Sequence, residues 1–328
     1  TLSEHSMNHS PLRVSIVTPS FNQAAFLEET ILSVLEQDYP DIEYLIIDGG
    51  STDNSVEIIR KYAPRLTYWV SEPDSGQSEA INKGWRRSTG DIIAWLNADD
   101  TYCPGAIRKV VEIFEKNPEL LLVHGAANTY DQSGQKLLFT SQPFDMDPYE
   151  MIAGCGGVTT QPSTFLRRTV LDEVGYLDPR LHYIMDWEYW IRIGLHYGHQ
   201  RFHKTDTVLS NNRDWPGTKT NRGWKEICKE NRLVLHDLFA QHPDDVKLQR
   251  IRSAAYRSSY RKQAELAREN GHPIEALHDT WRAWRIDPLG HNPLREIVLI
   301  LSVLLGRKLS ERLRSGLAPV RKRLNRLI

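Results

Sequence analysis

The sequence has no long hydrophobic run. The longest candidate, residues 297–305, is far shorter than the roughly 20 apolar residues of a membrane span, and Ser302 interrupts it. Residues 1–11 are polar and lack the apolar core of a signal peptide, so we expect a disordered leader there. We therefore expect no segment of this sequence to cross a membrane.

Cysteine is scarce as well. The 328 residues include three cysteines, Cys103, Cys155 and Cys228, and none of them forms a CxxC pair. This number and this spacing argue against a disulfide framework and against a structural zinc site. A reducing, cytoplasmic setting fits best.

The chain has no excess of positive charge, since its formal net charge is −1. Nucleic acid is therefore not expected as the main partner. No GxGxxG follows the first expected strand, and no GxxxxGK[ST] occurs anywhere, which disfavours dinucleotide-binding and P-loop folds. The hydrophobic content of 40% is ordinary for a globular protein.

The first hundred residues alternate between strand and helix signals. Strands are predicted at residues 14–18, 43–47, 66–70 and 92–96, and helices at 26–37, after Ser51, and at 79–88. This order predicts an α/β fold with a mostly parallel sheet flanked by helices. Its last strand is nearly all apolar, as expected for a strand that is buried on both faces.

The remaining chain is expected to complete this domain and add a helical extension. Strands are predicted at 120–124 and 136–139, and helices at 167–174 and 186–195. After residue 223 the chain is Arg-rich and helical, with a helix, turn and helix at 253–270 and 274–286. The predicted domains are thus residues 12–222 and 223–328.

Polar clusters follow three of the predicted strands: residues 18–22 (TPSFN), 48–51 (DGGS) and 97–100 (NADD). Ligands of parallel α/β sheets bind outside the carboxyl ends of the strands. One such cluster is readily explained as a turn, but three at successive strand ends favour a binding site. The pair Asp99 and Asp100 could hold Mg²⁺ or Mn²⁺, since these cations prefer oxygen ligands.

These clusters belong to longer motifs that resemble family 2 glycosyltransferases with the GT-A fold. The motifs are residues 14–22 (VSIVTPSFN), 46–55 (IIDGGSTDNS), 71–84 (SEPDSGQSEAINKG), 90–100 (GDIIAWLNADD), 161–165 (QPSTF) and 185–190 (MDWEYW). The resemblance extends over roughly residues 12 to 220. It implies a bacterial enzyme of polysaccharide or cell-envelope synthesis that inverts the anomeric configuration.

The resemblance also implies roles for individual residues. Contacts to the donor are expected from Thr18, Pro19, Ser20, Asn22, Asp48, Asp74, Asn97 and Asp99. Asp48 resembles the carboxylate that accepts an N–H of the base. Asp99 and Asp100 match the DXD-type element that binds ribose and a divalent metal, and its first position is Asn97. Asp186 resembles the catalytic base, although Met185 precedes it where many family members have Glu.

The implied reaction moves a sugar from a nucleoside-diphosphate sugar, with UDP favoured, to a hydroxyl of a glycan or lipid-linked acceptor. Two alternatives stay open, a nucleotidyltransferase that makes nucleotide sugars and a non-catalytic nucleotide-sugar-binding or glycan-binding module. Arg213 and Lys219 are candidates for a diphosphate contact, and His182 for an acceptor contact. The alternative role for Asp186 is an N-cap of the helix that follows it.

The C-terminal region carries one further pattern. Apolar residues recur every three or four positions from Leu309 to Leu327, among many Lys and Arg. This pattern predicts either peripheral contact of residues 297–328 with the cytoplasmic face of a membrane, or a helix packed on the protein or on a second chain. A homo-oligomer therefore stays open.

Overall fold

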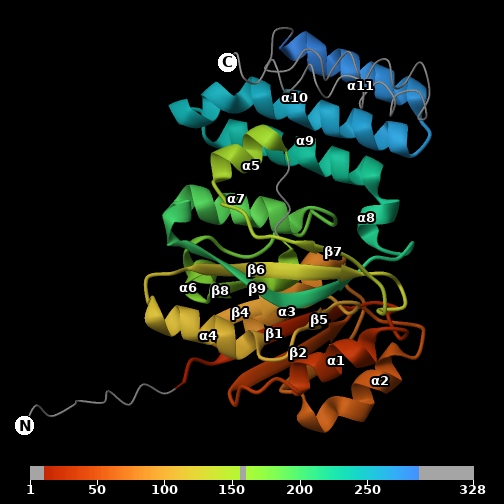
Figure 1. The fold of residues 1–328 in the computed structure, drawn as a ribbon, viewed down its shortest axis with the longest axis vertical. Helices are drawn as coiled ribbons and strands as arrows, with labels where there is room; N and C mark the ends of the chain where they lie inside the picture. Colours follow the sequence, from red (N-terminus) through yellow and green to blue (C-terminus); the bar gives the residue numbers. More distant parts are fainter. Residues whose placement is uncertain (1–10, 156–159, 288–328) are drawn as a thin grey trace, which may run out of the picture. The chain divides into compact units, whose positions relative to one another are not determined.

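The computed structural model describes residues 11–155 and 160–287 of the chain (Figure 1). Its strands are β1 (Val14–Ser20), β2 (Ile42–Asp48), β3 (Tyr68–Ser71), β4 (Ile92–Trp95), β5 (Thr101–Tyr102), β6 (Leu122–Tyr130), β7 (Leu137–Ser141), β8 (Thr164–Arg167) and β9 (Phe202–Arg213). The α-helices are α1 (Leu27–Leu35), α2 (Ser55–Tyr62), α3 (Gln77–Arg87), α4 (Ala106–Lys116), α5 (Pro148–Gly154), α6 (Thr169–Glu173), α7 (Met185–Tyr197), α8 (Lys219–Arg222), α9 (Trp224–Gln241), α10 (Val246–Glu269) and α11 (Pro273–Ile286). Short 3₁₀ helices are η1 (Ala63–Arg65), η2 (Gln161–Ser163) and η3 (His199–Arg201).

The described residues divide into two compact units. One contains residues 11–148 and 160–218, and the other contains 149–155 and 219–287. The boundary at 218/219 lies close to the predicted one after residue 222. Nothing in the sequence indicates that residues 149–155, most of helix α5, join the second unit.

A sheet in the first unit has the strand order β3-β2-β1-β4-β8-β6-β9-β5, with β7 paired to β6. Its first four strands are all parallel, as the alternation of strands and helices predicts. The crossover from β3 through α3 to β4 places β1 and β4 side by side in the sheet (Figure 1). The carboxyl ends of these four strands therefore share one edge.

The second half of the sheet is mixed rather than parallel. Strand β8 runs antiparallel to both β4 and β6, whereas β9 runs parallel to β6. Strand β6 continues to Tyr130, well beyond the predicted end at residue 124, through a run of small residues. A side chain at Gly125 would meet Leu209 Cδ1 at 2.5 Å, so close pairing with β9 requires glycine there.

Both faces of β1 and β4 are buried, which explains their nearly continuous apolar sequences. On one face, Val14 and Ile16 pack with Ile31 of α1 and Phe114 of α4. On the other face α3 lies directly on the sheet, because a Cβ at Gly84 would be 2.5 Å from Val17 Cγ1. Helix α3 is thus held tightly above the strands whose ends carry the predicted site.

Helices α9, α10 and α11 make up most of the described second unit, and α10 packs against α11 as the predicted helix–turn–helix (Figure 1). Helix α10 begins at Val246, earlier than predicted, because the Asp245 carboxylate caps it by accepting the Leu248 N–H at 2.9 Å. Among the helices that the structure describes, none is long and apolar enough to cross a membrane. The predicted leader and the predicted membrane-contact segment 297–328 lie outside the described residues, apart from Pro11.

Candidate active site

Three of the predicted polar clusters meet at one edge of the sheet. Ser20 of β1 is paired in register with Asp48 of β2, and Asp48 with Ser71 of β3. On the other side of β1, the Leu96 N–H donates to the Val17 carbonyl, which brings the start of the NADD cluster level with Thr18. The edge therefore carries the residues that the sequence assigns to the donor.

Asp48 organises the loop that follows β2. Its Oδ2 accepts hydrogen bonds from the Gly50 N–H, the Ser51 N–H and the Ser71 hydroxyl, at 3.1, 2.9 and 2.7 Å. Its Oδ1 accepts the Ser51 hydroxyl at 2.6 Å, and the residue is fully buried. In this conformation Asp48 shapes the loop, and its contact with a base stays a prediction.

The loop after β1 is tied to this loop. Asn22 has a left-handed backbone (φ 53°), its N–H donates to Ser51 Oγ at 2.8 Å, and its Oδ1 accepts the Thr52 N–H at 2.8 Å. Upstream, Thr18 Oγ1 lies 3.0 Å from the Tyr44 hydroxyl, and Pro19 is buried in the sheet. The Ser20 hydroxyl is buried without a hydrogen-bond partner among the described residues. Asn22 thus connects the loop after β1 to the loop after β2, whereas the hydroxyl of Ser20 can still form a hydrogen bond with a ligand.

Phe21 is a candidate that the sequence reasoning missed. It lies between Ser20 and Asn22 at the end of β1, and it is 59% exposed. A large aromatic side chain left exposed beside polar groups at a strand end can stack on the π-face of a base. Its place within the TPSFN cluster was the available signal.

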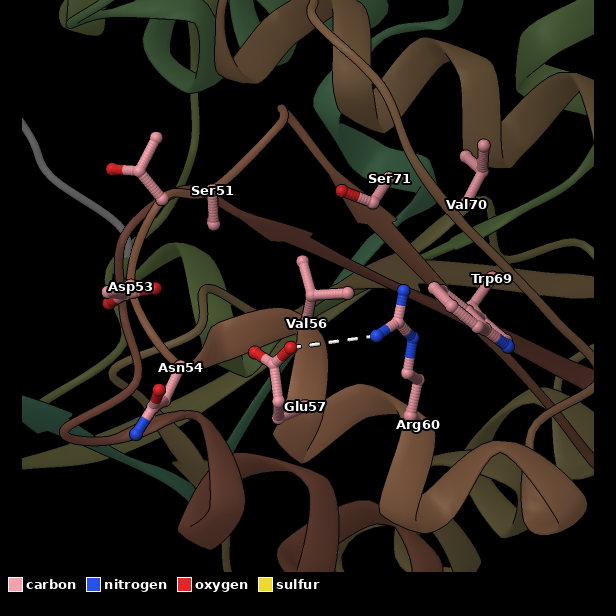
Figure 2. A pocket seen from close by; sticks show the side chains of 10 residues that line it. Ser51, Asp53, Asn54, Val56, Glu57, Arg60, Trp69, Val70 and Ser71 are labelled. Carbon is pink, nitrogen blue, oxygen red and sulfur yellow. Dashed lines mark ion pairs between the residues drawn. The ribbon is translucent and has the colours of Figure 1, made fainter.

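A pocket of about 780 Å³ opens beside the Asp48 loop, between helix α2 and strand β3 (Figure 2). Its lining residues are Ser51, Thr52, Asp53, Asn54, Val56, Glu57, Arg60, Trp69, Val70 and Ser71. Glu57 and Arg60 form an ion pair at 3.5 Å on its wall. Since Ser51 and Ser71 also donate to Asp48, the pocket shares part of its wall with the Asp48 loop.

Asn97 is the centre of a hydrogen-bonded network at the end of β4. Its Nδ2 donates to Asp100 Oδ2 and to Gln161 Oε1, both at 3.1 Å, and its Oδ1 accepts from Gln77 Nε2 at 2.6 Å. Gln161 is itself fixed by donating to the Trp95 carbonyl at 2.7 Å. An aspartate at position 97 has no N–H to give Asp100, so the amide serves the network and holds Asp100 in place.

The two adjacent carboxylates stand in different surroundings. Asp99 Oδ2 accepts the indole N–H of Trp215 at 3.0 Å. Asp100 is 7% exposed, and its two oxygens accept from the Arg213 N–H at 3.2 Å and from Asn97. Burial and the neighbouring Asp99 carboxylate raise the pKa of Asp100 well above its ordinary value. A negative charge at this place is therefore costly unless a cation balances it.

These residues fit a divalent cation. The two oxygens of Asp100 accept the hydrogen bonds from Arg213 and Asn97 and keep further acceptor capacity, and carboxylate oxygen is the ligand that Mg²⁺ and Mn²⁺ prefer. Across residues 11–155 and 160–287, no group of three or more His, Cys, Asp or Glu side chains gathers as a metal site. A cation here would thus need further oxygen ligands, as expected where substrate phosphates supply them.

Asp74 lies in the loop between β3 and α3. Its Oδ1 accepts the Gly76 N–H at 2.9 Å, and burial raises its pKa. A Cβ at Gly49 would lie 2.9 Å from Asp74 Oδ2, so this carboxylate sits against the backbone of the Asp48 loop. Asp74 therefore belongs to the same group of residues as Asp48.

Asp186 lies in the first turn of α7, after the N-cap position that Ile184 occupies. The alternative role as an N-cap is therefore wrong, although Asp186 Oδ1 does accept the Trp187 N–H at 2.8 Å. Burial raises the pKa of Asp186 to about 6, despite this hydrogen bond. A carboxylate with a raised pKa is a better proton acceptor than an ordinary aspartate.

Helix α3 links the donor edge to the segment that carries Asp186. The Ser78 hydroxyl donates to the Leu181 carbonyl at 2.6 Å. Asn82 makes two hydrogen bonds with the Leu177 backbone, at 2.8 and 3.0 Å. His182 packs on the loop before α3, since a Cβ at Gly76 would be 2.8 Å from its Nδ1. The predicted acceptor contact of His182 stays a prediction.

Arg213, a candidate for a diphosphate contact, is already paired in this structure. Its side chain is 8% exposed and pairs with Glu29 at 2.5 Å, while its Nη1 donates to the Gln132 carbonyl at 2.9 Å. Its guanidinium also lies 4.8 Å from the Phe26 ring. Arg213 therefore lies beside Asp99 and Asp100, whose backbone and side chain its Nε and N–H contact, and its diphosphate contact stays a prediction. Lys219, the other candidate, belongs to the second compact unit.

Aromatic side chains of α7 form core, as their helical spacing predicts. Trp187 and Trp190 are 8% and 1% exposed. Trp95 of β4 contacts both Trp190 and Trp85 of α3, with ring centroids 5.5 and 5.4 Å apart. Strand β4, which leads into the loop with Asp100, thus shares one aromatic cluster with α3 and α7, which carry Gln77 and Asp186.

The family model for glycosyl transferase family 2 matches residues 15–175. An uncharacterised glycosyltransferase of Nostoc sp. is 30% identical over 191 residues, which cover 55% of this chain and 56% of that protein. The chain spans about half the length of the curated relatives it matches.

Solved structures share the fold. Staphylococcus aureus TarS 1–349, in complex with UDP-GlcNAc, has a TM-score of 0.63 at 15% identity, covering 93% of this chain and 92% of that one. The mannosyltransferase PcManGT of Pyrobaculum calidifontis, with GDP-Man and Mn²⁺, has a TM-score of 0.57 at 18% identity, covering 93% and 84%. The chain therefore carries a family 2 glycosyltransferase domain with the GT-A fold.

Proposed function

We propose that this protein transfers a sugar from a nucleoside-diphosphate sugar to an acceptor hydroxyl and inverts the anomeric configuration. One observation carries the proposal: helix α3 joins an edge bearing Asp48, Asp99 and Asp100 to the segment bearing Asp186, through Gln77 and Ser78. The edge with the acidic groups proposed to bind the sugar donor and the segment with the carboxylate proposed to take the proton of the acceptor hydroxyl are thus hydrogen-bonded to the same helix.

The proposed mechanism is a single displacement. The acceptor oxygen attacks the anomeric carbon as its proton passes to the carboxylate of Asp186. The bond from that carbon to the phosphate oxygen breaks, and the nucleoside diphosphate leaves with the electron pair. Attack and departure occur on opposite faces, so the configuration inverts. No covalent nucleophile is needed for this reaction.

The metal site would be formed by Asp100 and Asp99, with Asn97 positioning Asp100. A bound Mg²⁺ or Mn²⁺ would stabilise the charge that develops on the diphosphate leaving group. The similar mannosyltransferase PcManGT was solved with Mn²⁺, which supports a divalent cation in a protein of this fold. Loss of activity in a chelator, restored by either cation, is the matching test.

The donor class is a nucleoside-diphosphate sugar, and we favour UDP. The two similar structures were solved with UDP-GlcNAc and GDP-Man, so a shared fold accepts either base. A carboxylate such as Asp48 suits N–H groups of uracil or guanine. The acceptor that we propose is a glycan or a lipid-linked saccharide of the bacterial envelope.

A screen of nucleotide sugars tests the proposal. Full-length protein with Mn²⁺ is incubated with each donor, and free nucleoside diphosphate is measured with and without candidate acceptors. Release of UDP or GDP with a glycosylated product supports the proposal. Formation of a nucleotide sugar from sugar phosphate and nucleoside triphosphate would instead identify a nucleotidyltransferase. Binding without any turnover would identify a binding module.

Phe21→Ala is expected to weaken UDP binding about 5–150-fold, the range that corresponds to about 1–3 kcal/mol of stacking. Little stability should be lost, because the side chain is 59% exposed. Calorimetric titration with UDP measures the effect. Pyrophosphate, which lacks the base, should bind Phe21→Ala and the unaltered protein equally. The matched control is Phe139→Ala on β7, where the Phe is 57% exposed. Equal loss in both variants would contradict stacking at Phe21.

The pH dependence should report Asp186. Because the base must be deprotonated, kcat/KM is expected to fall about tenfold for each pH unit below about 6, the raised pKa of Asp186. Above that pH, activity should reach a plateau. The acid limb should be missing from the residual activity of Asp186→Asn. A limb that persists in this variant would assign the titration to another group.

A further inference from the structure

Helix α11 carries an apolar stripe on its exposed side. The stripe consists of Ile274, Leu277, Trp281 and Trp284, which are 84%, 39%, 50% and 48% exposed. Their spacing of three, four and three residues places them along one line of the helix. Two tryptophans this exposed on one helix mark a surface that meets something other than water.

The stripe is not the side of α11 that packs within the unit. That role belongs to small side chains on the opposite side, Ala276, Thr280 and Ala283, which are fully buried. They face α10, where Ala264 and Ala267 are also fully buried. Helix α11 thus has one face satisfied by its own fold and one apolar face that the described residues leave exposed.

The charged groups near the stripe are arginines and carboxylates that are already paired. Arg285 is exposed beside the stripe, and its guanidinium lies 4.8 Å from the Trp281 ring centroid. Arg282 is exposed on an adjacent side of α11, where its guanidinium lies 5.6 Å from the Tyr260 ring of α10. Glu275 pairs with Lys225 at 3.0 Å. Asp279 is 2% exposed and lies 3.5 Å from Arg282. The two carboxylates of α11, Glu275 and Asp279, are thus each paired with a cation.

We propose that α11 docks on an anionic lipid surface, with the stripe in the headgroup region and the flanking arginines on lipid phosphates. Tryptophan favours the membrane interface, and an apolar helix face bordered by Arg is the pattern of interfacial helices. Residues 288–328, which follow α11, contain nine Lys or Arg and two Glu, so the adjoining sequence suits the same negative surface. This excess of positive charge, together with the exposed tryptophans, favours a lipid surface over a protein partner.

Binding of the full-length chain to vesicles tests the docking surface. The protein is sedimented with vesicles of phosphatidylcholine alone or mixed with phosphatidylglycerol, at low and high salt. Binding is expected only with phosphatidylglycerol and should weaken at high salt. Trp281→Ser/Trp284→Ser should weaken it at least about tenfold, because Trp anchors the helix at the interface. The matched control is Leu137→Ser/Phe139→Ser on β7, with residues 48% and 57% exposed.

A second variant, Arg282→Glu/Arg285→Glu, keeps the stripe and reverses two charges, and it should bind anionic vesicles more weakly at low salt. Failure of the unaltered chain to bind any vesicle would overturn the proposal. If in that case the tryptophan variant also melts at a lower temperature, residues 297–305 of the chain itself would be the occupant. If the tryptophan variant and the arginine variant both bind anionic vesicles as tightly as the unaltered chain, α11 has no part in membrane contact. The contact would then be assigned to the basic residues 307–328 alone.

Discussion

Asp186→Asn is expected to lower turnover about 10²–10⁴-fold, the usual contribution of a general base. The amide has the shape of the carboxylate and can still accept the Trp187 N–H, so the start of α7 should be preserved. It has no basic oxygen to take the acceptor proton at neutral pH. Steady-state kinetics with saturating donor and acceptor measure the loss.

Two controls separate chemistry from folding in this experiment. UDP affinity of Asp186→Asn should remain within about twofold of the unaltered protein, because the base contributes to the reaction rather than to donor binding. Asp172→Asn, an identical change at an exposed position of α6, should leave turnover unchanged. Near-normal turnover in Asp186→Asn would show that another group accepts the proton.

Asp100→Asn is expected to lower kcat/KM at least about 100-fold, since the loss of metal stabilisation is worth several kcal/mol. The buried amide keeps an acceptor for the Arg213 N–H, so the fold should persist. It removes the negative charge that a cation would balance. Asp99→Asn, made in parallel, reports which of the two carboxylates contributes more.

The role of Asp100 can also be tested without catalysis, by measuring the affinity for UDP. Mn²⁺ is expected to strengthen UDP binding to the unaltered protein, and calorimetric titrations with Mn²⁺ or with chelator compare this effect across variants. The effect should be lost in Asp100→Asn and kept in Asp172→Asn. An undiminished effect of Mn²⁺ in Asp100→Asn would remove Asp100 from the metal site.

The parallel half of the fold was predictable because local signals agree there. Apolar runs end in polar turns, and helices with one apolar face separate them, so β1 to β4 follow from the sequence. Strands β8 and β9 were not predicted. The sequence of β9, FHKTDTVLSNNR, has no clear alternation, and its strand is stabilised by pairing with β6 and β5, which are distant in sequence.

The sequence named the candidate site residues but not the contacts between them. The NADD motif indicates that Asp99 and Asp100 belong to the site. The contacts of Gln77 and Gln161 with Asn97 are visible only in the structure. The ion pair of Arg213 with Glu29 was not predictable, because the two residues are distant in sequence and meet only in the fold. Phe21 was not predicted because a phenylalanine after a strand is usually buried, and its exposure is visible only in the fold.

The attachment of the Asp186 segment to α3 has a consequence for making chimeras between relatives. Ser78 and Asn82 bind residues 176–186 by three hydrogen bonds that all end on backbone atoms, of Leu177 and Leu181. A graft of residues 176–186 therefore keeps these bonds only where α3 of the host offers the same two side chains. The natural unit of exchange is therefore discontinuous, namely α3 together with 176–186 and the start of α7. Grafts that carry both parts should keep the melting temperature of the host, while a graft of residues 176–186 onto a host without the two α3 side chains should melt at a lower temperature.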